Sequence, residues 1–593
     1  MKKLIIDNLA KESFNIGFFF IMFIFFNVLT TSLFFLLKIS ITNWNFILAT
    51  FLSIGLLIHR EFRRNESIKN NIIRSLIVLF IIVALSLTSI IISTKLHDTS
   101  WDGNTYHKTA IGAMKNGWNP VYENIETFDK NSKSGMNIDE YNYLWSNHYA
   151  KTTWIFSANM YKITENIESG KSITLFIGMS TFFLFASLFF SKKKYIIGII
   201  VSLLISFNPV YIAQLFTYYL DGLVGNLLFL LILCIYLWYS EKEPDEEPTF
   251  IALFIAILVL LINLKFNAFA YAGLTCLIFF IYFITKIKEK KLFIQKYVIA
   301  GITAVLIGIL LVGASSYVKN TIQKKHPFYP LMGAGSVDIM TAQQVKSFEE
   351  MPYLKKFFVA NFYETNNQVY ASGDIKLNFK MPFTYKEKEL KTLQATDSRI
   401  GGYGVYFGGI LILSLIILPI SIILKKKKSQ NTTFLLCSIA SIPIIILFLK
   451  DAWWARYFPQ LYLIPIAAII TSWFNGKKLL KFASIVLIYL LCLNNYIYIK
   501  SRLTKVYEDK IAIVEQYEKF YNNSHNKSEV IITDLKEFSG TKYNILDFIN
   551  KYSLDNLKIS FREIEDTDKY DAYQVERYCG LVYLPKTIEG EER

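Results

Sequence analysis

A short polar segment after the third apolar run carries the residues best suited to acid–base chemistry. It reads His97-Asp98-Thr99-Ser100-Trp101-Asp102-Gly103-Asn104-Thr105-Tyr106-His107. A carboxylate such as Asp102 can accept a proton from a hydroxyl group. The spacing of apolar residues over 105–115 predicts a short amphipathic helix in the membrane interface, whose dipole would favour an ionised Asp102 at its N-terminus. Asp102 could instead be a simple helix N-cap, and spacing alone favours that interpretation.

The chain as a whole has the composition of a membrane protein. Its 593 residues are 53% hydrophobic and 16% aromatic, and its mean hydropathy is +0.34. Many of its apolar runs are long enough to cross a hydrocarbon core roughly 30 Å thick. The first run is too long for the apolar core of a cleavable signal peptide. Hydropathy predicts about 13 transmembrane helices, near 15–38, 43–58, 73–95, 172–190, 195–210, 218–239, 249–264, 267–285, 296–317, 403–424, 432–449, 458–473 and 478–499.

Basic residues indicate which ends of these helices face the cytoplasm. Much of the net charge of +16 lies in short clusters between apolar runs, such as Lys192–Lys194 and Lys425–Lys428. These clusters follow even-numbered spans, as the positive-inside rule expects of cytoplasmic loops. The charge therefore reflects topology in the cell membrane and not nucleic-acid binding. It predicts a cytoplasmic N-terminus and an extracytoplasmic position for loops 96–171 and 318–402 and for the polar region 500–593.

We expect two domains. Residues 1–499 form a transmembrane domain, in which loop 318–402 is long enough to be partly helical and to cover a cavity as a lid. Residues 500–593 alternate short β-like runs with helical stretches, which predicts a small C-terminal α/β domain without a catalytic pattern. The five cysteines show neither metal-ligand spacing nor a disulfide framework.

Unusual polar residues gather in the other outward-facing turns. They are Asp221, Lys265, Asn320, His326 and Arg456. Ionisable groups at membrane depth are costly, so they need a reason. Lys265 and Arg456 could be snorkelling anchors. Trp453-Trp454 could form an aromatic belt at the membrane interface, and the stretch 141–149 could either join that belt or stack on a sugar. Together, the turns could surround one cavity for an anionic lipid headgroup and an acceptor that loses a proton.

The order of these segments resembles that of a known superfamily. Residues 101–107, Trp-Asp-Gly-Asn-Thr-Tyr-His, resemble the first-loop signature of bacterial GT-C glycosyltransferases, a WD-x-x-TYH pattern after an early span. Four later pieces resemble features of the same families in the same order: the Asp221 turn, Lys265-Phe266, Asn320 through Pro330, and Arg456 through Pro459. The resemblance covers residues 73–475. It departs at Lys319, where the families have Arg, at His326, which replaces Gly-Asn, and in two additional spans before the motif.

The resemblance implies a GT-C-like fold and an inverting transfer of a monosaccharide from a polyprenyl-phosphate donor to an acceptor hydroxyl on the extracytoplasmic face. The acceptor would be a glycan or cell-wall polymer, such as teichoic acid or another surface polysaccharide. Asp102 would be the catalytic base, with Asp98 as the alternative. Lys265 and Arg456 would hold the donor phosphate. The residues expected to bind or orient the acceptor and the sugar are Tyr106, His107, Asp221, Asn320 and His326. A divalent cation is compatible with this chemistry, although two acids from separate loops do not define a metal site.

Three other functions fit parts of the pattern. A transporter or flippase of lipid-linked sugars would place its charges on a path through the bilayer, near the midplane, whereas here they stand at outer helix ends. A polymerase or ligase of surface polysaccharide shares the membrane chemistry but uses longer, usually diphosphate-linked donors. A scaffold protein would depend on the C-terminal domain alone. Release of polyprenyl phosphate from a donor separates the transferase from all three.

Overall fold

The computed structural model describes the chain apart from residues 1, 64–66, 132–139, 242, 368–376, 425–429, 525–526, 534–537, 553, 555–556, 563, 565, 577–579 and 587–593. Within the described residues, ten helical segments are long and apolar enough to cross a membrane. They comprise α1 (Lys2–Leu36), α2 (Asn43–Phe62), α3 (Ile68–Thr94), α8 (Ser172–Ser191), α11 (Asp221–Ser240), α12 (Glu247–Leu264), α13 (Phe266–Ile284), α14 (Ile287–Leu306) with η3 (Ile307–Val312), α20 (Gln430–Ile439) with α21 (Ser441–Phe448), and α23 (Lys478–Ser524).

Three shorter apolar segments lie where further spans were predicted. They are α9 (Tyr195–Ser206), α19 (Phe407–Ile423), and η7 (Pro459–Tyr462) with α22 (Leu463–Trp473). The predicted polytopic α-helical membrane protein is thus confirmed, while the number of spans stays a prediction.

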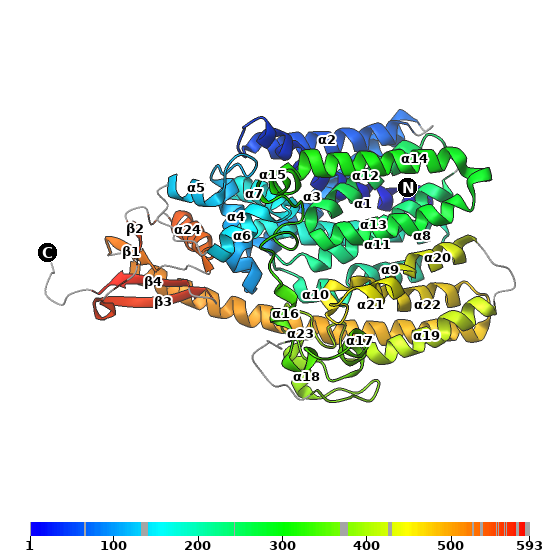
Figure 1. Cartoon of the computed structure of the whole chain (residues 1–593). Coiled ribbons are helices and arrows are strands. Elements are labelled where there is room, and N and C mark those ends of the chain that lie inside the picture. The colour runs from blue at the N-terminus through cyan, green and yellow to red at the C-terminus, as the bar shows by residue number, and fades with distance from the viewer. Residues whose placement is uncertain are drawn as a thin grey trace.

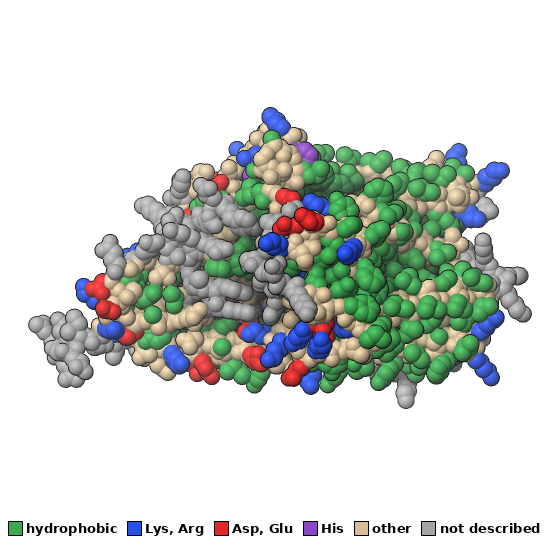
Figure 2. Space-filling model, turned by 60° about the horizontal axis from the view of Figure 1, so that its bottom comes forward, with side chains coloured by type: hydrophobic (Ala, Val, Ile, Leu, Met, Phe, Trp, Pro, Cys, Tyr) green, Lys and Arg blue, Asp and Glu red, His purple; other side chains and the backbone are tan. Residues whose placement is uncertain are grey.

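The sides of the helical bundle have the apolar surface that contact with lipid requires. Phe80, Ile196 and Phe448 are 75%, 78% and 82% exposed. On the face that Figure 2 shows, hydrophobic side chains cover most of the bundle and charged side chains lie mainly toward its two ends. Soluble monomers rarely expose apolar patches of this extent.

The basic turns and the long loops lie at opposite ends of the bundle. Helices α8 and α13 begin at the end that carries the loop helices and run away from it (Figure 1). The turns with Lys192–Lys194 and Lys286–Lys291 therefore lie at the far end. The predicted cluster Lys425–Lys428 is outside the described residues. A single assignment of sides remains consistent with the positive-inside rule, and the cytoplasmic position of the N-terminus stays a prediction.

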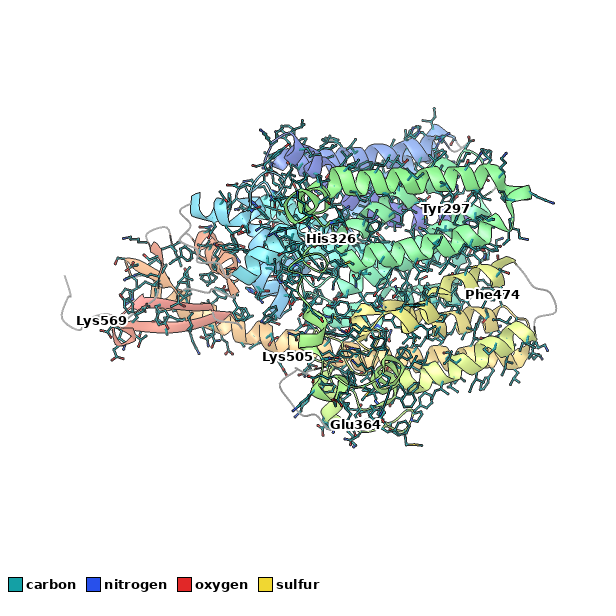
Figure 3. All side chains as sticks on the ribbon, viewed as in Figure 1. Tyr297, His326, Glu364, Phe474, Lys505 and Lys569 are labelled. Atoms are coloured by element: carbon teal, nitrogen blue, oxygen red, sulfur yellow. The ribbon has the colours of Figure 1, made fainter. Side chains whose placement is uncertain are left out.

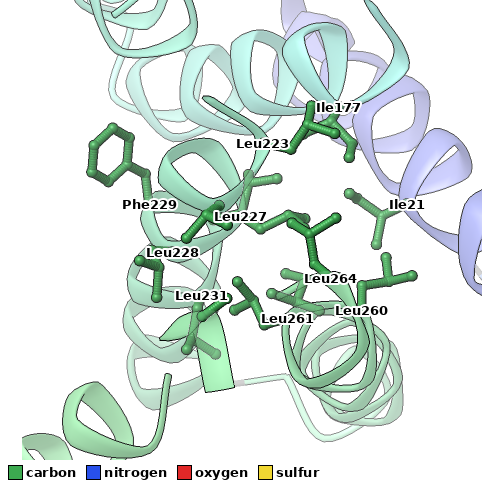
Figure 4. Close-up of a cluster of buried hydrophobic side chains, with 14 of the residues drawn as sticks. Ile21, Ile177, Leu223, Leu227, Leu228, Phe229, Leu231, Leu260, Leu261 and Leu264 are labelled. Atoms are coloured by element: carbon green, nitrogen blue, oxygen red, sulfur yellow. The ribbon is translucent and has the colours of Figure 1, made fainter. Parts of the chain in front are cut away.

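The packing of α11 against α12 sets the position of two charged residues. Leu223 and Leu227 of α11 are buried close to Leu260 and Leu264 of α12, beside α1 and α8 (Figure 4). The two helices are antiparallel neighbours, so the first residue of α11 and the residue after α12 lie at the same end. These residues are Asp221 and Lys265.

The first long loop folds into a series of short helices at that end. They are η1 (Gly103–His107), α4 (Lys108–Lys115), α5 (Ile125–Asn131), α6 (Glu140–His148), α7 (Thr152–Thr164) and η2 (Ile167–Lys171). The predicted helix over 105–115 is present, as a π-helical turn that continues into α4. Its position in the membrane interface is wrong, because every residue from Gly103 to Met114 is buried. Side chains of the C-terminal domain cover it, which periodicity cannot show.

The second long loop is also partly helical, as predicted. After η4 (Ala314–Val318), which ends the preceding span, it contains α15 (Lys319–Lys324), α16 (Ile339–Gln343), η5 (Lys346–Phe348), α17 (Tyr353–Phe362) and α18 (Glu387–Thr392). Two further short helices, α10 (Pro209–Gln214) and η6 (Ala455–Tyr457), lie in turns between apolar segments.

The C-terminal region is a small α/β unit attached by one long helix. Helix α23 has 47 residues and runs from the bundle into this unit without a break at residue 500. In Figure 3, Phe474 lies in the bundle, Lys569 lies in the C-terminal unit, and Lys505 lies on α23 between them. The sheet order is β2-β1-β4-β3, with β1 (Glu529–Ile532) parallel to β2 (Lys558–Phe561) and antiparallel to β4 (Gly580–Pro585), which pairs with β3 (Tyr570–Glu576). The remaining elements are α24 (Lys542–Lys551) and η9 (Thr567–Lys569).

Candidate active site

The turn that precedes Asp102 is held by the other aspartate of the segment. The Asp98 carboxylate accepts hydrogen bonds from the backbone N–H groups of Ser100, at 2.7 Å, and Tyr218, at 2.8 Å. Asp98 is fully buried, and a side chain at Gly103 would collide with its Oδ2 atom. Only glycine therefore fits at 103, and Asp98 fastens the first loop to the turn that leads into α11. The structure does not bring Asp98 into the cluster described next.

Asp102 itself is not a helix cap. It has helical angles, φ −57° and ψ −37°, and its side chain caps no backbone N–H group, so the N-cap interpretation is wrong. Its carboxylate is 20% exposed and lies 3.9 Å from Nη1 of Arg456. Burial raises the pKa of Asp102, while Arg456 and Lys265 oppose that rise. A carboxylate with a raised pKa is a stronger base than a free one.

Asp221 and Lys265 form the second part of the site. Their side chains pair at 2.5 Å, and Gln214 donates a hydrogen bond to the other Asp221 oxygen at 3.0 Å. The Lys265 ammonium also lies over the ring of Tyr457, 4.4 Å from its centroid. Burial opposes the charge on Lys265, yet Asp221 and the neighbouring phenols raise the pKa of the ammonium overall. Lys265 is thus a paired cation and not a snorkelling anchor.

Arg456 joins the two acids. Its Nη1 lies 3.9 Å from both Asp102 and Asp221. Its guanidinium sits against a group of rings formed by Trp454, Tyr219 and Tyr457, at 4.7, 5.1 and 5.0 Å from their centroids. The side chain is only 8% exposed, which excludes a snorkelling role. Burial opposes its charge, but Asp397 and the surrounding groups hold its pKa well above the usual value.

Arg456 is buried without using all of its hydrogen-bond donors. Its Nη2 donates to the Tyr457 hydroxyl at 3.3 Å. Among the residues that the structure describes, none accepts a hydrogen bond from its Nε or Nη1. Unsatisfied buried donors are uncommon and costly, more so on a charged group. The guanidinium therefore keeps N–H groups, on two of its edges, that an oxyanion ligand could accept from.

Sequence reasoning missed Asp397. This residue comes from the second long loop, and its Oδ1 lies 3.3 Å from Nε of Arg456. Arg399 and Trp454 each donate a hydrogen bond to its carboxylate at 2.8 Å. A single aspartate in a polar loop gave no signal, because only the folded loop brings it to the cluster. We call Asp102, Asp221, Lys265, Asp397 and Arg456 the active-site cluster.

Two predicted site residues lie behind the cluster, among buried rings. The ring of Tyr106 lies against that of His107, at 4.4 Å between centroids, and against that of Trp145, at 6.0 Å. His107 accepts a hydrogen bond from Trp154 Nε1 at 2.6 Å. Burial, aided by Lys265, lowers the pKa of His107 to about 3. His107 is therefore neutral, and its Nδ1 is engaged.

The structure does not bring Asn320 and His326 into the cluster. Asn320 is buried, donates to the backbone oxygens of His148 and Tyr329, and lies 2.7 Å from Nδ1 of His148. His326 accepts a hydrogen bond from the Phe328 backbone N–H, and Figure 3 places it at the loop end of the bundle. Asn320 thus fastens the second loop to the first.

The predicted aromatic belts are wrong. Trp453 and Trp454 are 2% and 0% exposed, and their rings stack on each other. In the stretch 141–149, Trp145 and Tyr149 are also buried. Trp453, Trp454, Trp145 and Tyr149 are therefore packed inside the protein, while Tyr143 is half-buried and the role of the other rings of the stretch stays a prediction.

A second group of buried charges supports the loop that carries Asp102. Glu168 pairs with Lys108 at 2.7 Å and with Lys171 at 2.6 Å. Asn544 of α24 accepts from Lys108 at 2.8 Å and donates to Glu168 at 2.7 Å. We call Asp98, Lys108, Glu168, Lys171 and Asn544 the support cluster. Through Asn544, the C-terminal domain is part of the structure that positions the loop.

Further hydrogen bonds join α24 and the residues just before it to the first loop. Gly540 N–H donates to the Asn104 oxygen at 3.0 Å, and the Thr109 and Ser539 hydroxyls lie 2.8 Å apart. Asp547 accepts a hydrogen bond from the Ile167 backbone N–H at 2.7 Å.

Within the described residues, no group of three His, Cys, Asp or Glu side chains is arranged for a metal ion. The divalent cation stays a prediction.

The chain has distant likenesses to solved structures, two of which are crystal structures of ArnT. No protein-family model and no curated protein sequence matches the chain. The chain is similar to the crystal structure of ArnT from Cupriavidus metallidurans bound to undecaprenyl phosphate, with 9% identity and a TM-score of 0.37 over 86% of this chain and 98% of that one. For the crystal structure of ArnT in the apo state, the identity is 10% and the TM-score is 0.39, over 86% of this chain and 97% of that one. TM-scores below 0.5 mark a remote likeness, so the chemistry of this chain is assigned from its own residues.

Proposed function

We propose that this protein transfers a monosaccharide from a polyprenyl-phosphate donor to a hydroxyl group of an acceptor glycan or cell-wall polymer. The observation that carries the proposal is the pair of unused donors on buried Arg456, 3.9 Å from the carboxylate of Asp102. A phosphate oxyanion would accept hydrogen bonds from these charged N–H groups. A carboxylate beside it supplies the base that a hydroxyl nucleophile requires.

The proposed reaction is a single displacement at the anomeric carbon. Asp102 accepts the proton of the acceptor hydroxyl while its oxygen forms a bond to sugar C1. The bond between C1 and the donor phosphate oxygen breaks, and polyprenyl phosphate leaves with the electron pair. Arg456 stabilises the charge that develops on the phosphate. Attack opposite the leaving group inverts the anomeric configuration.

Lys265 and Asp221 support the same phosphate position. Lys265 is paired with Asp221, so it adds positive charge at one edge of the cluster while Asp221 fixes where the ammonium lies. Asp397 and the stacked rings keep the guanidinium of Arg456 in place before the donor arrives. Such preorganisation is a major source of transition-state stabilisation.

The position of the cluster suits a lipid-linked donor. All five side chains lie at the loop end of the bundle, where helices that cross a bilayer meet the outer loops. A polyprenyl chain can remain in the hydrocarbon while its phosphate reaches Arg456. An extracytoplasmic site and an acceptor such as teichoic acid or another surface polysaccharide complete the proposal.

The test is a transfer assay with purified full-length protein in lipid nanodiscs. A polyprenyl-phosphate monosaccharide and a cell-wall polymer are supplied, and release of polyprenyl phosphate and sugar incorporation are measured. Equal release and incorporation are expected. With the protein in sealed liposomes, movement of an intact donor across the bilayer without release would identify a flippase. Turnover of diphosphate-linked oligosaccharides alone would identify a polymerase or ligase.

A further inference from the structure

A large cavity separates the C-terminal domain from part of the first loop. Its volume is about 1180 Å³, and none of its lining residues belongs to the active-site cluster. Helices α23 and α24 form one wall, and residues 94–97 and 164–168 form the other. A volume of this size accommodates several sugar units.

The wall formed by α23 and α24 is aromatic. Tyr517 stacks on Phe548 with 4.5 Å between ring centroids, and Phe548 and Tyr521 lie 4.6 and 5.2 Å from Tyr552. Tyr552 is 43% exposed. Tyrosine rings combine an apolar face with a polar tip. The C–H face of a sugar ring packs on such a face while its hydroxyl groups stay hydrated or bonded.

Amide side chains line the same cavity. They are Asn166, Asn522, Asn544 and Asn550. An amide both donates and accepts hydrogen bonds, which matches a chain of hydroxyl groups. Asn544 links the cavity to the support cluster, because it also bonds Lys108 and Glu168.

The charged groups of the lining balance one another. Glu168 is engaged by Lys108 and Lys171. Counted together, the charged side chains of the lining are three lysines and four acids, namely Lys95, Lys510, Lys551, Glu165, Glu168, Glu518 and Asp547, so there is no excess of positive charge. A site for a phosphate or a polyanion would carry an excess of positive charge. The balance favours an uncharged, polyhydroxylated ligand.

We propose that this cavity is a binding site for an uncharged stretch of glycan, which holds the acceptor chain away from the point of transfer. The proposal rests on the proposed glycosyl transfer for its biological meaning, but glycan binding can be measured without any turnover. The occupant is an oligosaccharide that stacks on Tyr521 and Tyr552 and bonds to the amides of the lining.

The experiment is a calorimetric titration of the full-length protein in nanodiscs with three uncharged probes, maltohexaose, chitohexaose and mannohexaose. At least one probe is expected to bind. The double variant Tyr521→Ala/Tyr552→Ala should weaken that binding by about tenfold or more, as loss of aromatic anchors does at other interfaces. The single variant Tyr552→Phe keeps the ring and should retain binding.

A matched control lies on the same helix. Tyr507 is 63% exposed on α23 and does not line the cavity, so Tyr507→Ala should bind the probe normally. Thermal unfolding of each variant checks that the C-terminal domain remains folded. Tyr552→Ala alone, at an exposed helix end, serves if the double variant unfolds.

Three results would overturn the proposal: no binding of any of the three probes, equal binding by the double variant, or binding of poly(glycerol phosphate) in place of the neutral probes. None of these results bears on donor cleavage, so a failure here is distinct from a failure of the transferase assignment. If the site serves transfer, the double variant should also raise KM for a long acceptor while the rate with a monosaccharide acceptor stays unchanged.

Discussion

The protein contains two buried clusters of charge that differ in how completely their members are paired. In the support cluster, Glu168 lies 2.6–2.7 Å from its two lysines, and Asn544 takes up further hydrogen bonds. In the active-site cluster, Arg456 lies 3.3–3.9 Å from three carboxylates. Its Nε and Nη1 donate no hydrogen bond to any described residue. Both clusters are buried and charged, so burial and charge alone do not identify a reactive site. What sets the active-site cluster apart is unused bonding capacity on a buried charged group, which calls for an explanation such as a ligand.

The largest expected effect follows from removing the proposed base. Asp102→Asn should lower transfer by about a thousandfold or more, as loss of a general base does, while donor binding and folding persist. Transfer rate and donor affinity of the purified variant measure this. Near-normal turnover would remove Asp102 as the base.

Asp98→Asn is the variant to compare with Asp102→Asn, because Asp98 is the alternative base. Its carboxylate bonds two backbone N–H groups and lies outside the cluster. We expect a loss of stability, and a rate per folded molecule close to that of the unaltered protein. If instead the rate per folded molecule collapses and stability does not, Asp98 is the base.

The next largest effect concerns the support cluster. Glu168→Gln would leave Lys108 and Lys171 buried without their anion, and breaking a buried pair this way costs about 3–5 kcal/mol. Unfolding in a denaturing detergent series should show that loss. Glu165→Gln is the control, because the Glu165 side chain is 63% exposed. Equal stability of the two variants would contradict the description of a fully paired cluster.

A smaller effect is expected from a conservative change at the phosphate site. Arg456→Lys keeps the charge but removes the bidentate fork, so KM for the donor should rise by about tenfold to a hundredfold. KM for the acceptor should change little. Arg399→Lys is the matched variant at a neighbouring guanidinium, which donates hydrogen bonds to Asp397 and to the backbone oxygen of Gln343. A similar rise in donor and acceptor KM for Arg456→Lys would argue against a phosphate role.

The smallest effect is a pH dependence of the contact between α24 and the first loop. Burial raises the pKa of Asp547 to about 7 in the folded protein, from an ordinary value of 3.8. A raised carboxyl pKa means that its contribution to stability is full below pH 3.8 and is lost as the pH rises through about 7. Burial lowers the pKa of Lys542 to about 7, which acts in the opposite direction at higher pH.

The variant Asp547→Asn separates the two contributions. Its unfolding midpoint should fall less than that of the unaltered protein between pH 4 and pH 7. Parallel pH profiles for the two proteins would show that Asp547 does not titrate in this range.

The sequence was enough to predict which candidate site residues lie together where those residues stand at the ends of apolar helices. Hydropathy located the apolar segments, and charge bias placed the turns with Asp221, Lys265 and Arg456 on the same side as Asp102. Antiparallel packing brings such turns together, so hydropathy and charge were enough to group these four residues. Asp397 could not be found in this way, because its position depends on the fold of a long polar loop.

The predictions of what surrounds the helix after Asp102 and the Trp453-Trp454 pair were wrong for a related reason. Periodicity indicates which face of a helix is apolar, but it does not say what covers the other face. The helix after Asp102 and the Trp453-Trp454 pair were therefore expected at the membrane interface, whereas the C-terminal domain and the second loop bury them. Asn320 and His326 lie in a segment that resembles the family pattern, yet their hydrogen bonds are to the backbone of the loops and not to the cluster.

Helix α23 joins the helical bundle to the C-terminal domain as one continuous helix. Its 47 residues correspond to a rod of about 70 Å at 1.5 Å per residue, of which roughly 30 Å lies in hydrocarbon. The rod is continuous, so a change in its tilt is carried directly to α24 and to the loop contacts that α24 makes. Membranes of different thickness change the tilt of such helices. Lipid composition is thereby a physical variable that reaches the loop bearing Asp102 from outside the active site.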